Sequence, residues 1–150
     1  MDKRLTYIFL FIFLFTNWGC TSFNLVEAEA GAPIIDLVSI TPSTVKEFED
    51  SIEIVISYKD SDGDLGTENP DVNFLTIQDL RLTKADYYYV PLLAPPEARI
   101  NIEGTLTIHL KNTFLLGTSD SEVTSYQIIL TDRANNKSNV LITDQITITR

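Results

Sequence analysis

Three carboxylates, spaced one residue apart, follow the most regular apolar–polar alternation in the chain. Asp60, Asp62 and Asp64 lie in residues 60–66, and the two glycines of that run favour a tight loop. Carboxylates at alternate positions of a folded loop can converge on one hard cation. Calcium takes about six to eight oxygen ligands from carboxylates, backbone carbonyls and water. The spacing therefore predicts a candidate calcium site.

The spacing resembles the start of an EF-hand loop but departs from it further along. Leu65 stands where the turn glycine belongs, and Asp71, at the twelfth position, is one methylene shorter than the usual bidentate glutamate. No helical pattern flanks the loop, so an EF-hand is excluded. Similar Asp-x-Asp-Gly-Asp runs in cadherin-like surface modules imply a calcium loop between strands. The alternative is a solvated turn without a ligand, because aspartate and glycine are common turn residues.

Short apolar–polar alternations predict the elements that must position this loop. Strands are expected at residues 34–40, 52–59, 72–82, 87–91, 100–110, 123–131 and 140–149. No stretch after residue 32 has a helical apolar period. Gly104 interrupts the fifth strand and is expected to mark a bulge. Seven short strands at this spacing predict an all-β, antiparallel sandwich over residues 33–150.

The sequence at 126–138, Tyr-Gln-Ile-Ile-Leu-Thr-Asp-Arg-Ala-Asn-Asn-Lys-Ser, resembles the closing hairpin of bacterial immunoglobulin-like surface modules. Those modules carry a tyrosine, alternating apolar residues and then Asp-x-Ala-Gly-Asn-x-Ser. Asn135 takes the place of the glycine, and asparagine tolerates a left-handed turn. The resemblance implies a seven-stranded antiparallel immunoglobulin-like β-sandwich, with cadherin-like and fibronectin III-like modules as its nearest types.

In that strand order, the loop after the second strand and the loop before the last strand lie at the same end. Asp132 could therefore complete a calcium site begun by Asp60, Asp62 and Asp64, with Asp71 as a further candidate ligand. The first strand, which carries Asp36, begins at that end too. A bound ion would then stiffen the junction between the domain and the chain that precedes it.

The first twenty residues have the pattern of an export signal. Lys3 and Arg4 precede an apolar run at 5–15, which is too short to span a bilayer because spanning needs about 20 residues. Gly19 stands directly before Cys20, and the segment resembles a bacterial lipoprotein signal peptide. That resemblance implies removal of residues 1–19, lipidation of Cys20 and a flexible tether over 20–32. The alternative is a plain secretory signal with a free thiol.

The lipoprotein resemblance implies a location in the bacterial cell envelope. Thr21, rather than an aspartate, follows the cysteine and favours the outer over the inner membrane. The chain carries 21 acidic against 11 basic residues, a formal charge of −10, which excludes nucleic acid as a partner. With one cysteine, no disulfide forms within the chain, so the hydrophobic core must stabilise the fold.

An enzyme is not expected. His109 is the single histidine, and its position between Ile108 and Leu110 places it on the solvent side of a strand. Without a second histidine or a further cysteine, the chain lacks the residues needed for a zinc site or for a Ser-His-Asp arrangement with a choice of partner.

Two apolar segments are candidates for partner contact. Tyr87 and Tyr89 could form an exposed aromatic strip, and Leu92 and Leu93 lie in an unusually apolar loop. The alternative is that Tyr88 points inward and its neighbours pack under the loop.

We therefore expect a non-enzymatic, lipid-anchored envelope protein with a structural or adhesive role, and with calcium as the one cofactor the sequence suggests. Its partners would be the membrane and another envelope protein or a glycan. The alternative is a glycan- or small-ligand-binding lipoprotein that works beside a transporter, with the tyrosines as its platform.

Overall fold

The computed structural model describes residues 31–150, and all structural statements refer to that part of the chain. It contains strands and turns and no helix, so no helix there is long and apolar enough to cross a bilayer. The strands are β1 Ile34–Thr41, β2 Thr44–Lys46, β3 Ile52–Asp60, β4 Leu75–Asp79, β5 Asp86–Tyr88, β6 Ile102–Leu110, β7 Ser121–Thr124, β8 Tyr126–Leu130, β9 Leu141–Ile142 and β10 Ile146–Thr149. The expected signal peptide, Cys20 and most of the expected tether lie outside the described residues.

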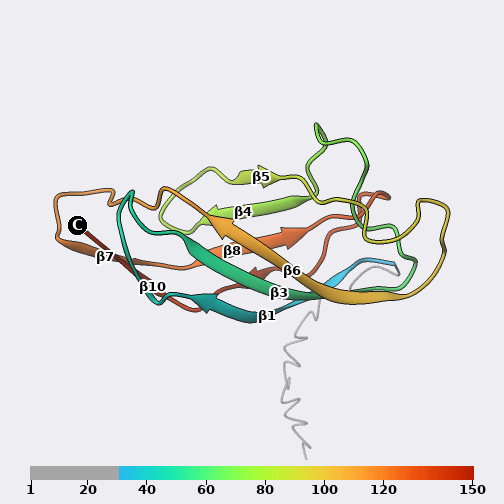
Figure 1. Cartoon of the computed structure of the whole chain (residues 1–150), viewed down its shortest axis with the longest axis horizontal. Helices are drawn as coiled ribbons and strands as arrows, with labels where there is room; N and C mark the ends of the chain where they lie inside the picture. The colour runs from blue at the N-terminus through green and yellow to red at the C-terminus, as the bar shows by residue number, and fades with distance from the viewer. Residues whose placement is uncertain (1–30) are drawn as a thin grey trace, which may run out of the picture.

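The strands form three sheets. Their orders are β1-β3-β6, β5-β4-β8-β9 and β2-β10-β7. Figure 1 shows β1, β3 and β6 running beside one another, with β4, β5 and β8 grouped above them. Every pair within these sheets is antiparallel except β2 with β10, which run parallel. The all-β class that the alternation predicted is confirmed.

The alternation of β3 explains how its sheet meets the core. Ile52, Ile54 and Ile56 are fully buried on one face, while Glu53 and Lys59 are exposed on the other. The same buried cluster contains residues of β1, β4, β8 and β10, so the sheets share one core. Each buried isoleucine contributes about 1.5–3 kcal/mol relative to an exposed one, which makes the core the main source of stability.

The expected count of seven strands differs from the ten observed. The stretch 123–131 divides at Ser125 into β7, which pairs with β10, and β8, which pairs with β4. The stretch 140–149 divides into β9 and β10 in the same manner, and the three-residue β2 was not expected. A chain that passes from one sheet to another keeps its apolar alternation, so the sequence pattern does not show the break.

The expected bulge at Gly104 is wrong. The β3–β6 register runs without a shift from Ile52 opposite Leu110 to Asp60 opposite Ile102. Gly104 instead makes room for a side chain, because a Cβ there would lie 2.7 Å from the Tyr58 hydroxyl. The irregularity in this sheet lies in β1, between Leu37 and Ser39.

Candidate functional site

The loop after β3 brings three carboxylates together. One carboxylate oxygen from each of Asp60, Asp62 and Asp64 lies within 4.8 Å of the other two. Asp60 is fixed as the last residue of the β3 ladder, and the Asp64 amide donates to its Oδ2 at 2.9 Å. Gly63 reverses the loop with φ +71°, and a Cβ there would lie 2.6 Å from the Ile100 carbonyl oxygen. The position therefore requires glycine.

Each of these carboxylates is withdrawn from water and has one oxygen without a hydrogen-bond donor. Asp60 is 3% exposed and Asp64 4% exposed, while Asp62 is half-buried. The Oδ1 atom of each of the three is buried and has no hydrogen-bond partner. An unpaired buried carboxylate oxygen is unfavourable, by about 1–3 kcal/mol or more. A cation at this point would supply the missing partner for all three.

The electrostatics of the loop follow from this arrangement. Burial raises the pKa of Asp60 to about 6, and the negative charges of Asp62 and Asp64 add to the rise, whereas the hydrogen bond from the Asp64 amide opposes it. Burial also raises the pKa of Asp64, together with the charges of Asp132 and Asp62 and against that of Arg133. The negative charge of the loop thus exceeds what the nearby positive charge of Arg133 and the backbone amide of Asp64 offset.

Asp132 lies next to this group but serves the turn after β8. It is fully buried; its Oδ1 accepts from the Asn136 amide at 2.7 Å and its Oδ2 accepts from Asn136 Nδ2 at 2.8 Å. The Arg133 amide donates to the Asp64 carbonyl at 3.2 Å, so the two loops meet as the strand order predicted. Asn135 adopts φ +71°, the left-handed turn expected of it. Asn136 thus engages both carboxylate oxygens of Asp132, and Asp132 is not among the three grouped carboxylates.

The structure does not bring Asp71 or Asp36 into the group. Both are exposed, and the Asp71 amide donates to Asn69 Oδ1 at 3.0 Å. Gly66, at φ +78°, turns the chain after Asp64, and Thr67 then forms a bridge with Pro91. The loop has therefore left the carboxylates before it reaches Asp71.

Two residues that sequence reasoning missed complete the surroundings. Gly31 lies beside Asp62, since a Cβ on it would be 3.4 Å from Asp62 Oδ2. Arg133 donates from Nη1 to the Gly66 carbonyl at 3.1 Å and from Nη2 to the Pro96 carbonyl at 3.2 Å, and it lines a cavity of about 230 Å³ with Asp62 and Asp64. These contacts join distant segments, so no local pattern could have indicated them.

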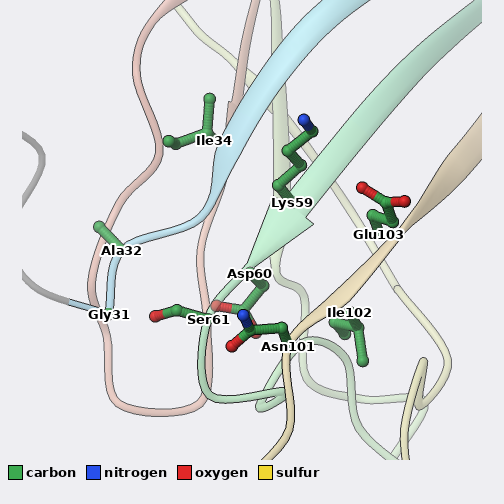
Figure 2. A pocket seen from close by; sticks show the side chains of 9 residues that line it. All are labelled: Gly31, Ala32, Ile34, Lys59, Asp60, Ser61, Asn101, Ile102 and Glu103. Carbon is green, nitrogen blue, oxygen red and sulfur yellow. The ribbon is translucent and has the colours of Figure 1, made fainter.

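A second cavity, of about 570 Å³, lies at the end of β3. Gly31, Asp60 and Glu103 are among the residues that line it. Figure 2 shows Asp60, Ser61 and Asn101 close together near the end of the β3 arrow. Asp60 therefore belongs both to the carboxylate group and to the lining of this cavity.

The tyrosine strip is partly exposed. Tyr87 is 65% exposed and Tyr89 is 39% exposed, while Tyr88 is half-buried and packs against the core. Leu92 and Leu93 are half-buried, and Leu93 also packs against the core. The loop that contains Leu92 and Leu93 therefore packs in part against the hydrophobic core.

His109 faces solvent, as the alternation predicted. Its Nδ1 atom lies 3.9 Å from Oε2 of Glu53, and Glu53 is directly opposite His109 in the β3–β6 ladder. Both side chains are about half exposed, so the pair contributes at most about 1 kcal/mol.

A comparison with protein-family models finds no match, and a comparison with curated proteins finds none either. Among solved structures, the chain is similar to the PKD domain of an M14-like peptidase from Thermoplasmatales archaeon SCGC AB-540-F20. The two share 12% sequence identity with a TM-score of 0.37, over 79% of this chain and 94% of the other. Similarity at this level says nothing about ligands or partners.

Proposed function

We propose that the protein is a non-enzymatic structural or interaction module in which a calcium ion stabilises the loop after β3. The observation that carries the proposal is the set of buried, unpartnered Oδ1 atoms of Asp60, Asp62 and Asp64. Gly31 contacts the same loop, so an ion there would fix the point at which the chain enters the domain.

Calcium fits the loop better than magnesium. Calcium accepts irregular coordination by carboxylates, carbonyls and water, whereas magnesium requires a near-octahedral shell and keeps several waters. The three carboxylates come from one five-residue loop and offer an irregular set of oxygen ligands, which suits calcium better than the octahedral shell of magnesium.

Thermal melting of the full chain in EDTA, calcium and magnesium tests the ion. Calcium at 100 times its dissociation constant should add about 2.7 kcal/mol to the free energy of unfolding, and magnesium less. Asp62→Asn should abolish the calcium shift. Asp71→Asn is the matched control and should retain it, because Asp71 lies outside the group. A melting temperature indifferent to calcium and EDTA would refute the ion.

We further propose that the domain is an immunoglobulin-like sandwich attached to the bacterial envelope, at the outer membrane, through lipidated Cys20. The sheet orders β1-β3-β6 and β5-β4-β8-β9 support this fold. A multiply acylated cysteine supplies the two or more signals that stable membrane attachment requires. Intact-mass measurement of the membrane-bound protein tests the anchor, with Cys20→Ser expected to release it. An unmodified cysteine in that fraction would contradict the proposal.

A second candidate is a glycan- or small-ligand-binding lipoprotein that works beside a transporter. The exposed ring of Tyr87 on the outer strand β5 favours it, although the 570 Å³ cavity is lined by neither Tyr87 nor Tyr89. Glycan-array binding that is lost in Tyr87→Ala and kept in Tyr87→Phe would favour this role over a purely structural one.

A further inference from the structure

The outer edge of β6 is long, and no other strand among residues 31–150 protects it. β6 pairs with β3 over all nine of its residues, and within residues 31–150 no other strand pairs with it. No hydrogen bond outside that ladder reaches its backbone in the described part of the chain. About half of its backbone donors and acceptors therefore point away from β3, in one row, and have no backbone partner among residues 31–150.

The opposite edge of the same sheet is protected in two ways. A register shift interrupts β1 between Leu37 and Ser39. In addition, the Ile35 amide donates to Asn139 Oδ1 at 2.9 Å, and Asn139 Nδ2 donates back to the Ile35 carbonyl at 2.9 Å. These are common ways of preventing strand addition at an edge.

β6 has none of these features. It contains no proline, lysine or arginine, its ladder has no register shift, and its outward residues include the exposed Thr105 and Thr107. A long, regular edge of this kind is a template for an added strand.

We propose that β6 pairs in antiparallel fashion with β6 of a second copy of this chain, which makes a two-fold dimer with one continuous six-stranded sheet. The register that overlaps all nine residues is centred on Leu106. It places Thr105 opposite the partner's Thr107 and Glu103 opposite the partner's His109.

The side chains suit this register. Cross-strand threonine pairs are favourable, and a carboxylate opposite an imidazole can accept a hydrogen bond. No two like charges face each other, whereas a register centred on Glu103 would oppose two carboxylates. A two-fold interface requires such self-complementarity, and this is what favours a second copy over a foreign strand. The inference is independent of the calcium ion and of the lipid anchor.

A charge exchange at the two threonines tests the pairing. Thr105→Lys/Thr107→Lys should place lysines opposite one another across the dimer, and Thr105→Glu/Thr107→Glu should do the same with carboxylates. Each variant alone should self-associate about tenfold or more weakly than the parent chain. An equimolar mixture of the two should dimerise again, because lysine then faces glutamate. Thr105→Ser/Thr107→Ser is the matched control and should dimerise like the parent.

Light scattering and sedimentation of the full chain, in detergent with a reducing agent, provide the readout from about 1 to about 100 µM. Both threonines are exposed, and circular dichroism of each variant verifies the fold. A parent chain that stays monomeric over this concentration range would overturn the proposal. It would do so equally if a foreign extended peptide were found to bind the β6 edge of that monomer. Dimers that persist unchanged in both charged variants would also overturn it, since the edge would then not be the interface.

Discussion

Asp60 carries its charge at a position that is almost closed to water. Its pKa of about 6 reflects burial first and the neighbouring Asp62 and Asp64 second. An asparagine at this position would keep the hydrogen bond from the Asp64 amide without placing a charge there. The cation proposed for this loop would compensate the charge of all three carboxylates.

The first prediction concerns this charge. Asp60→Asn should raise the stability of the metal-free protein by about 1–3 kcal/mol, because it removes an unpaired buried charge while the amide oxygen still accepts from Asp64. The same change should remove the calcium-induced shift. Urea denaturation with and without EDTA measures both effects; a variant less stable than the parent in EDTA would contradict the first.

The second prediction concerns pH. The pKa of Asp60 is raised from 3.8 to about 6 in the folded state, so the native protein binds more protons than the unfolded chain between these values. Metal-free stability should therefore increase as pH falls, by about 1 kcal/mol from pH 7 to pH 5.

The contribution of Asp79 to stability changes with pH in the opposite direction, but it does not change between pH 7 and pH 5. Hydrogen bonds from Arg81 and Thr124 outweigh burial and lower the pKa of Asp79 below 3.8, so its contribution is lost only at more acid pH. Calorimetry at pH 7 and pH 5 in EDTA is the measurement. Saturating calcium should remove the gain, because protons then compete with the ion; a metal-free protein that loses stability at pH 5 would contradict the assignment.

At the scale of the elements, one arginine joins strands that belong to different sheets. Arg81, just after β4, donates from Nη2 to Asp79 Oδ2 at 2.6 Å and from Nη1 to Glu122 Oε2 of β7 at 2.7 Å. It also donates to the Phe114 carbonyl at 3.1 Å. The side chains of Arg81 and Asp79 are nearly nine-tenths buried, so the network is poorly screened by solvent.

Arg81→Ala should therefore lower the free energy of unfolding by about 2–4 kcal/mol, since it leaves the carboxylates of Asp79 and Glu122 without their cationic partner. Lys46→Ala is the matched control. It breaks the exposed pair with Glu49 and should lower the free energy of unfolding far less than Arg81→Ala does. Urea denaturation of both variants at pH 7 gives the comparison; equal losses would mean that Arg81 acts as an ordinary surface residue.

The loop after β3 depends on a glycine, Gly66. A Cβ on Gly66 would lie 1.9 Å from the Pro91 carbonyl oxygen, and its φ of +78° is unfavourable for other residues. Gly66→Ala should destabilise the chain by about 3 kcal/mol or more, because backbone must move. Gly117→Ala, whose nearest neighbour is Glu122 Oε1 at 3.4 Å, should be nearly neutral. Thermal melts distinguish the two, and similar melting temperatures would show that the backbone at Pro91 can move to accept the Cβ.

At the scale of the whole molecule, stability rests on one core built from several sheets. Ile128 of β8 is fully buried in the same cluster as Ile54 of β3. Ile128→Ala should cost about 2–5 kcal/mol, through lost burial and the cavity left behind. Val123→Ala, at an exposed position of β7, should cost less than about 1 kcal/mol. Chemical denaturation that finds similar costs would contradict a shared core.

The carboxylate site was predictable in part. Asp60, Asp62 and Asp64 are close in sequence, and a glycine turn can bring such residues together without help from distant segments. The expected approach of the loop after β8 followed from strand order. The role of Asp132 did not, because it depends on the Asn136 amide and side chain, which hold both of its oxygens.

By itself, the sequence determined the all-β class, the buried face of β3 and the convergence of three carboxylates, because these depend on residues within one strand or loop. Only the tertiary structure decided the division at Ser125, the network around Arg81 and the edge of β6 that no other strand of residues 31–150 covers. Each of those depends on which segments become neighbours in space. An alternating pattern specifies which face of a strand is buried, but not which strand, or which molecule, lies beside it.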